Sequence, residues 1–134
     1  MTHLVIAYNS NDWGLPGPIT PPDEMPTLDQ LTAGYRELIN RAEAAGLAAI
    51  LATVTPLGPE LAADPGREGT RLAVNDWIRT AGHEFVDFDA ALRSETDPSR
   101  LHDNYAAPDH THPSVNGEKR LAQAMAEALA RLRL

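Results

Sequence analysis

Short apolar runs alternate along this chain with longer segments of helical periodicity, and no other feature constrains the fold as strongly. The three apolar runs, each nearly continuous and therefore typical of a strand buried on both faces, are residues 4–8, 48–54 and 85–88. A segment with helical spacing follows each of them. The resulting order, β-α-β-α-β-α, predicts a parallel sheet with right-handed crossovers. We expect an α/β fold of three layers, with helices on both faces of a short parallel sheet.

Capping residues mark where the predicted helices begin and end. Thr27 followed by Gln30 matches a capping box, so the first helix should begin there, and Gly46 should end it. The second helix is expected over about 67–81, and the last over about 114–131. The apolar residues expected to face the core from these two helices are Val74, Trp77, Ile78 and Ala81, and Leu121, Ala122, Met125, Leu129 and Leu132. Loops are expected where Gly, Pro and polar residues gather, at residues 9–26, 55–66 and 93–113.

The composition suits one domain over residues 1–134 and excludes several functions. Apolar residues make up 43% of the chain, which is enough for a core. Without cysteine, the chain has no disulfide, thiolate zinc site or cysteine nucleophile. A net charge of −8 disfavours nucleic acid and anionic membranes as partners, and no apolar stretch approaches the ~20 residues of a membrane span. The chain as it stands is expected in the cytoplasm, whereas an upstream N-terminus would allow secretion. No cofactor is expected.

The densest polar cluster is the run Asp109-His110-Thr111-His112-Pro113. In open parallel sheets, ligands bind beyond the C-terminal ends of the strands, where this loop should lie. A carboxylate three residues before a histidine can reach a ring nitrogen, fix the tautomer and leave the histidine to act as a general base. By spacing alone, a turn capped by Asp109 beside solvated histidines fits equally well.

The same cluster has a second functional interpretation, as a metal site. His110 and His112 would project to one side of an extended segment, and Asp109, Asp103 and His102 are close in sequence. Histidine and carboxylate ligands suit zinc or another transition metal. No further ligand at helical spacing supports this hypothesis, so it ranks below the acid–base pair.

A second polar run, Asn9-Ser10-Asn11-Asp12, directly follows the first predicted strand. Asn11 is placed to offer its side-chain amide to the cleft, as an oxyanion donor would. Asn and Asp are also common turn residues, and without other information the residues favour a turn.

Taken in this order, the segments resemble the SGNH, or GDSL-type, hydrolases, a superfamily of esterases, lipases and acetylesterases. The third block of that family is Gly-x-Asn-Asp after a strand, and Asn11 and Asp12 match its last two positions. The fifth block is Asp-x-x-His, which Asp109 and His112 match. The run that ends at Gly117, before an Ala-rich helix, is similar to the family's closing Asp-x-x-His-Pro-x-x-x-Gly. The similarity covers nearly the whole chain and implies the flavodoxin-like SGNH fold without its first strand and helix.

The resemblance also implies an activity and a set of roles. The family hydrolyses acyl esters, among them acetyl esters, by a Ser-His-Asp mechanism. His112 would be the general base and Asp109 its orienting partner, while Asn11 would bind the oxyanion and, with Asp12, border the substrate. The substrate would be a small-molecule ester. The Gly-Asp-Ser block that supplies the nucleophile is absent from the sequence, and so is the second block with its oxyanion glycine.

Three hypotheses remain open at this point. The chain is a truncated ester hydrolase that is inactive alone, a non-catalytic binding module that keeps the fold, or a metal-dependent hydrolase using Asp109, His110 and His112. Asn9 replaces the glycine of the third block, and Ser10 lies near the expected cleft but outside any Gly-Asp-Ser setting. Absence of the first strand and helix should expose one sheet edge, which predicts a complementing segment or self-association through that edge.

Overall fold

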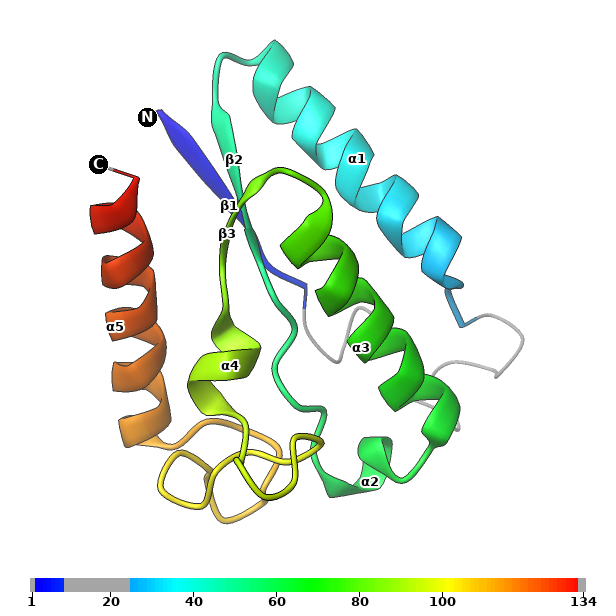
Figure 1. Cartoon of the computed structure of the whole chain (residues 1–134), viewed down its shortest axis with the longest axis vertical. Helices are drawn as coiled ribbons and strands as arrows, with labels where there is room; N and C mark the ends of the chain where they lie inside the picture. Colours follow the sequence, from blue (N-terminus) through cyan, green and yellow to red (C-terminus); the bar gives the residue numbers. More distant parts are fainter. Residues whose placement is uncertain (1, 9–24, 133–134) are drawn as a thin grey trace.

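The computed structural model describes residues 2–8 and 25–132 and contains a parallel three-stranded sheet (Figure 1). The strands, in spatial order, are β1 (His3–Ile6), β2 (Ala48–Ala52) and β3 (Glu84–Val86). The register pairs Ile6 with Leu51 and Ala52 with Val86. The predicted α/β fold class, with a small parallel sheet, is confirmed.

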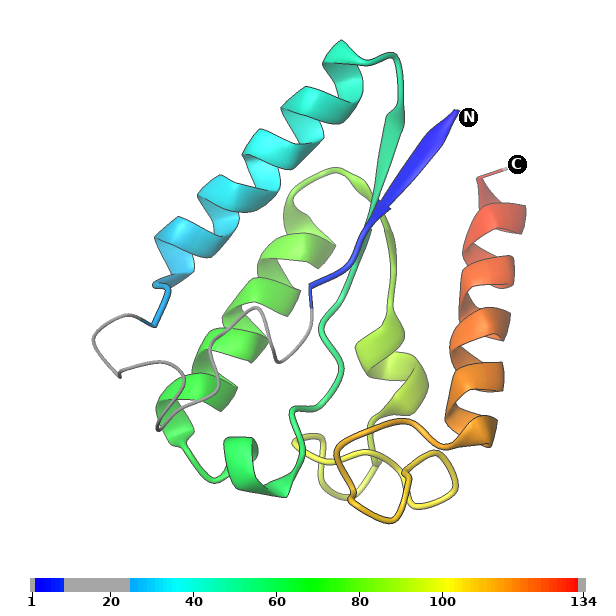
Figure 2. The ribbon, with the colours of Figure 1, turned by 180° about the vertical axis from the view of Figure 1, so that it is seen from behind.

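Helices cover both faces of this sheet (Figure 1 and Figure 2). They are α1 (Leu28–Ala44), α2 (Pro59–Ala62), α3 (Pro65–Thr80), α4 (Phe88–Leu92) and α5 (Val115–Arg131). The long helices α1 and α3 lie over one face, and α5 lies over the other together with the short α4. Tyr35, Leu51 and Val74 belong to the core on the α1 and α3 side, whereas Ala52 and Ala128 belong to a smaller core beneath α5. The expected three layers are therefore present.

The first helix begins and ends where its sequence signals predict. The Thr27 hydroxyl accepts the N–H of Gln30, and the Gln30 side chain accepts the N–H of Thr27, which completes the capping box. At the other end, Gly46 adopts a φ of +73°. The N–H groups of Gly46 and Leu47 donate to two carbonyls of the last turn, as in a Schellman motif. Local chemistry alone thus sets both ends of α1.

The strands β1 and β2 end at Ile6 and Ala52, before the ends predicted for them at residues 8 and 54. Two further boundaries differ from the prediction where a helix begins. The third strand stops before Asp87, because the Asp87 carboxylate accepts the N–H of Ala90 and caps α4. Phe88 therefore begins a helix and does not end a strand. The expected loop 55–66 contains α2 and the start of α3 at Pro65, whose fixed φ suits the first helical position.

The buried face of α5 differs from its predicted apolar stripe. The residues predicted to face the core are not fully buried. They are half-buried or exposed, and they are Leu121, Ala122, Met125, Leu129 and Leu132. The buried positions are instead Gly117, Ala124 and Ala128. Their small side chains allow α5 to approach α4 and β3 closely, so residue size selects this face more than hydrophobicity does.

The buried face of α3 is partly polar, and its polar side chains bind the chain that leaves β2. Val74 and Ile78 are buried as predicted, but Arg71 and Asn75 are fully buried too. The Asn75 side chain accepts the N–H of Val54 at 2.7 Å and donates to the Val54 carbonyl at 2.8 Å. Arg71 donates to the same carbonyl at 3.1 Å. Both backbone groups of Val54 are thus satisfied by side chains of α3.

Asp89 is the centre of a buried ion cluster next to Arg71. Its Oδ1 accepts from Arg71 at 2.5 Å, and its Oδ2 accepts from Arg79 and Arg93, each at 2.9 Å. Arg79 also donates to both carboxylate oxygens of Asp87. Burial works to lower the pKa of Arg71, but its carboxylate partners outweigh burial and raise it. The cluster joins α3 to α4 on the C-terminal side of the sheet.

Two surface features bear on the predicted partners. None of the helices within residues 2–8 and 25–132 is long and apolar enough to cross a bilayer. β1 forms one edge of the sheet, and its Val5 is 42% exposed. The partner predicted for this edge stays a prediction.

Asn75→Ala should lower the free energy of unfolding by about 1–3 kcal/mol, because the buried N–H of Val54 loses its partner. Urea denaturation followed by circular dichroism measures the change. The exposed neighbour provides the control, since Asp76→Ala should alter the unfolding free energy by no more than about 0.5 kcal/mol. Equal effects at the two positions would contradict the role given to Asn75.

Candidate active site

Asp109 and His112 face each other across a tight turn. Nδ1 of His112 lies 2.7 Å from Oδ2 of Asp109. The other carboxylate oxygen, Oδ1, accepts the N–H groups of Thr111 and His112, each at 3.0 Å. The backbone N–H of His112, then its side chain, then the N–H of Thr111 hold the pKa of Asp109 well below its ordinary value. Asp109 therefore caps a turn and contacts the imidazole at the same time.

This geometry determines which ring nitrogen of His112 carries the proton. An ionised carboxylate only accepts hydrogen bonds, so Nδ1 of a neutral ring must be the donor to Asp109. Nε2 is then an unprotonated acceptor, as a general base requires. No hydrogen bond within the described parts of the chain uses Nε2, and the His112 side chain is 76% exposed. The arrangement can take up a proton from a group that approaches from solvent.

The loop that carries the pair is closed on itself and rests on the start of α5. The N–H of Ala107 donates to the His112 carbonyl at 2.8 Å, and the N–H of Ser114 donates to the Tyr105 carbonyl at 2.7 Å. The Ser114 hydroxyl caps α5, as predicted, by accepting the N–H of Gly117. A Cβ at Gly117 would overlap the Tyr105 carbonyl oxygen, so the glycine lets the helix contact the loop directly. The start of α5 thus supports the loop that carries Asp109 and His112.

The two other histidines of the predicted metal site do not join His112. His110 occupies the turn at a φ of +55°, and its N–H donates to the Ala107 carbonyl. Nδ1 of His102 accepts the N–H of Asn104, and the ring contacts Tyr105 at a centroid distance of 5.3 Å. Among the described residues, no three His, Asp or Glu side chains converge as metal ligands would. The metal hypothesis gains no support from this geometry.

Asn11, Asp12 and Ser10 lie outside the described residues. The predicted roles of Asn11 and Asp12 at the oxyanion and substrate therefore stay predictions. The strand that leads toward them ends in the structure at Ile6, and Tyr8 packs edge-on against Tyr35 with ring centroids 4.6 Å apart.

Sequence reasoning missed the polar residues that support the C-terminal end of the sheet. Arg71 and Asn75 lie four residues apart and share the buried side of α3 with Val74 and Ile78. Polar side chains on an otherwise apolar helical stripe were the available signal. Their partners could not be read from the same signal, because Val54 lies far away in the sequence.

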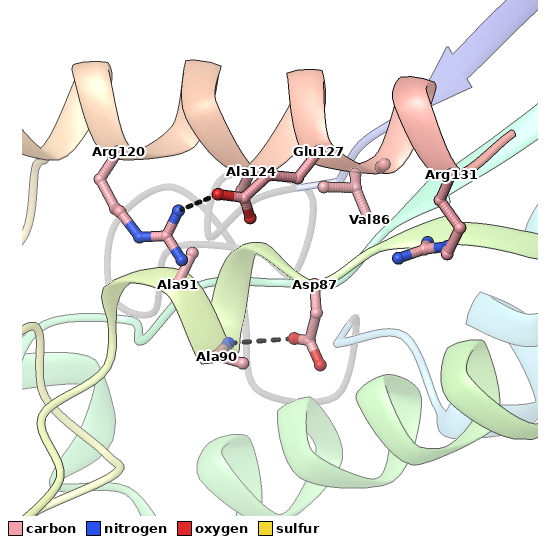
Figure 3. A pocket seen from close by; sticks show the side chains of 9 residues that line it. Val86, Asp87, Ala90, Ala91, Arg120, Ala124, Glu127 and Arg131 are labelled. Carbon is pink, nitrogen blue, oxygen red and sulfur yellow. Dashed lines mark hydrogen bonds and ion pairs between the residues drawn. The ribbon is translucent and has the colours of Figure 1, made fainter. Parts of the chain in front are cut away.

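A groove between α4 and α5 does not include the pair (Figure 3). Its volume is about 210 Å³, and the residues that line it are Val86, Asp87, Ala90, Ala91, Arg120, Ala124, Glu127, Ala128 and Arg131. Four alanines leave the space open, and Arg120 spans it toward Glu127 at 3.7 Å. The groove and the histidine pair are therefore separate features.

The chain matches the model of the GDSL-like lipase/acylhydrolase family over residues 2–120. A match over this share of the sequence shows that the chain belongs to that family. Among curated proteins, no sequence matched the chain significantly.

Solved structures with the same fold include two bacterial enzymes and one insect domain. A GDSL-like lipase from Bacteroides thetaiotaomicron has 17% identity and a TM-score of 0.60, with 79% of this chain and 54% of the lipase covered. The OSK domain of Drosophila Oskar has 22% identity and a TM-score of 0.62, with 76% and 53% covered.

The third structure has a closer sequence. It is a variant of an acetyl-xylooligosaccharide esterase from Geobacillus stearothermophilus, with 26% identity, a TM-score of 0.60, and 93% of this chain and 57% of the esterase covered. The chain thus spans little more than half the length of each structure. These likenesses show the fold of the chain.

The Asp109 carboxyl should titrate below its ordinary pKa of 3.8, and His112→Ala should raise that pKa only part of the way, because the backbone donors remain. Since the folded-state pKa is depressed, the ionised carboxylate stabilises the fold above pH 3.8, and this contribution is lost as the pH falls through the folded value. Carboxyl ¹³C NMR over a pH series measures the pKa of Asp109 in the parent chain and in His112→Ala. An unchanged titration in His112→Ala would show that the two side chains do not interact.

Proposed function

We propose that the chain carries the general base and the orienting carboxylate of a Ser-His-Asp ester hydrolase. The observation that carries this proposal is the 2.7 Å contact between Nδ1 of His112 and Oδ2 of Asp109 in a family of lipases and acylhydrolases. Nε2 of His112 takes the proton of a serine hydroxyl as its oxygen attacks the ester carbonyl, and returns it to the leaving alcohol. Asp109 holds the tautomer and stabilises the imidazolium. Asn11 donates to the oxyanion.

The proposed substrate is an ester of a small acyl group, such as an acetyl group on a carbohydrate. The support is the likeness to the acetyl-xylooligosaccharide esterase, which has the highest coverage of this chain among the three structures compared. The exposed ring of His112 agrees with a bulky alcohol that stays partly in solvent, because little of the chain encloses the base.

The proposed nucleophile is a serine outside these 134 residues. Three of the four serines in the sequence are engaged in local hydrogen bonds. Ser114 caps α5, Ser99 donates to the Asp97 carboxylate, and the Ser94 hydroxyl contacts Thr96. The fourth, Ser10, lies outside the described residues. We therefore expect the serine to be supplied by a further segment or by another chain.

A non-catalytic binding module is the second candidate function. The absence of a Gly-Asp-Ser run favours it, since the fold is kept while the nucleophile is missing from the sequence. The DNA upstream of the Met1 codon separates the candidates. An in-frame Gly-Asp-Ser favours the enzyme, and a stop codon favours the module.

The 134-residue chain should hydrolyse p-nitrophenyl acetate no faster than its His112→Ala variant, because a base without a nucleophile performs little acyl transfer. A fluorophosphonate probe should leave the chain unlabelled. Robust turnover that depends on His112 would contradict this expectation and place the nucleophile within the chain, with Ser10 as the first candidate.

In a protein that includes the serine, His112→Ala should lower kcat by about 10⁴-fold or more, and Asp109→Ala by about 10⁴-fold. His110→Gly is the matched control in the same turn, because glycine adopts the φ of +55° freely and keeps the backbone N–H. This variant should retain activity within a few-fold. Loss of activity in His110→Gly, together with loss of the parent protein's activity in a chelator and its recovery with added zinc, would instead favour the metal hypothesis.

A further inference from the structure

Two loops that are far apart in the sequence meet beside the Asp109–His112 pair. One is the β2 exit segment (residues 53–58), and the other is the turn that contains Thr111. A Cβ built on Gly58 would overlap the Thr111 hydroxyl and would lie 2.9 Å from its Cβ and 3.1 Å from its Cα. Rotation of the Thr111 side chain moves neither its Cβ nor its Cα, so it could not relieve these two contacts. Only a residue without a side chain fits here.

The backbone conformation of Gly58 is a second, independent reason why this position requires glycine. Its φ of 85° and ψ of 163° lie in a region that is essentially reserved for glycine. Gly58 is buried and precedes α2, with the Ala62 N–H bonded to its carbonyl at 2.9 Å. Sterics and conformation therefore both fix glycine at this contact.

The β2 exit segment is anchored by several contacts besides the one with Thr111. Asn75 and Arg71 bind the backbone of Val54, and the side chains of Val54 and Leu57 are buried in the core. Thr53 adds a hydrogen bond from its hydroxyl to the Asp87 carboxylate at 2.9 Å. The segment can therefore serve as a fixed support for whatever touches it.

Thr111 belongs to the turn that holds the carboxylate. Its N–H donates to Oδ1 of Asp109, and its hydroxyl donates to the Asp109 carbonyl at 3.2 Å. A shift of Thr111 would therefore move one donor directly and would disturb the neighbouring N–H of His112, which binds the same oxygen. The contact with Gly58 therefore affects the position of the turn through Thr111.

We propose that Gly58 is a positioning residue for the Asp109–His112 pair, and that its bare backbone supports Thr111 so that the turn aims the carboxylate at the imidazole. The catalytic meaning of this support rests on the proposed hydrolase function. The support itself is a property of the fold, and its test needs no turnover.

The test compares Gly58→Ala with Gly82→Ala. Gly82 also has a positive φ, +81°, but a Cβ there would meet nothing within 4 Å. Both variants carry backbone strain, and only the first presses on Thr111. In Gly58→Ala the pKa of Asp109 should rise toward 3.8, and the amide resonances of Thr111 and His112 should shift. In Gly82→Ala both should stay as in the parent chain. Carboxyl ¹³C titration and ¹H–¹⁵N spectra measure these effects.

A second pair of variants covers the case in which Gly58→Ala does not fold. Thr111→Gly removes the side chain that meets Gly58 but keeps the N–H donor, and Thr111→Ser keeps the Cβ and the hydroxyl. The first should raise the pKa of Asp109, and the second should leave it unchanged. If Gly58→Ala folds and Asp109 titrates as in the parent chain, or if Thr111→Gly has no effect, the positioning role is wrong. Absence of esterase activity in a protein that includes the serine would overturn the proposed function without touching this result.

Discussion

The backbone of Val54 is bound on both its polar groups by side chains from α3, and the arrangement beyond the C-terminal end of the sheet depends on this contact. A parallel strand that ends in the interior leaves an N–H and a carbonyl without ladder partners, and burial makes such groups costly unless they are bonded. Asn75 and Arg71 supply the bonds. Because the same Arg71 reaches Asp89, the exit of β2 and the start of α4 are tied to one helix. The loop that follows is thereby held where it meets Thr111.

Within the loop that this contact supports, electrostatic interactions in a short turn set the geometry of the site. Three donors, two of them backbone N–H groups, converge on the Asp109 carboxylate. They favour the charged form, and a charged carboxylate favours the His112 tautomer with its proton on Nδ1. The turn requires a left-handed residue at His110, and the packing of Gly117 against the loop aligns it with α5. A left-handed residue other than glycine is costly in an ordinary surface loop, and here the surrounding contacts hold it in place.

Local signals in the sequence predict much of this fold, and tertiary contacts decide the rest. The capping box at Thr27 and the N-cap Ser114 act within one turn, so the sequence alone places both helix starts. The buried face of α5 depends on which neighbours it meets, and there the small Ala124 outweighs larger apolar residues. The spacing of Asp109 and His112 was compatible with either a turn cap or an acid–base pair. The structure shows that the carboxylate both caps the turn and contacts the imidazole, which the spacing of the two residues alone could not reveal.

The account centres on His112 as a neutral imidazole whose Nδ1 is bound to a carboxylate and whose Nε2 is available. Imidazole ¹⁵N chemical shifts at alkaline pH, where a histidine ring is neutral, report the tautomer of this one side chain. The account predicts a proton on Nδ1 and an unprotonated Nε2. A neutral ring protonated on Nε2 would contradict it, because such a ring has no proton on Nδ1 to donate to Asp109 and no free Nε2 to accept one from a serine.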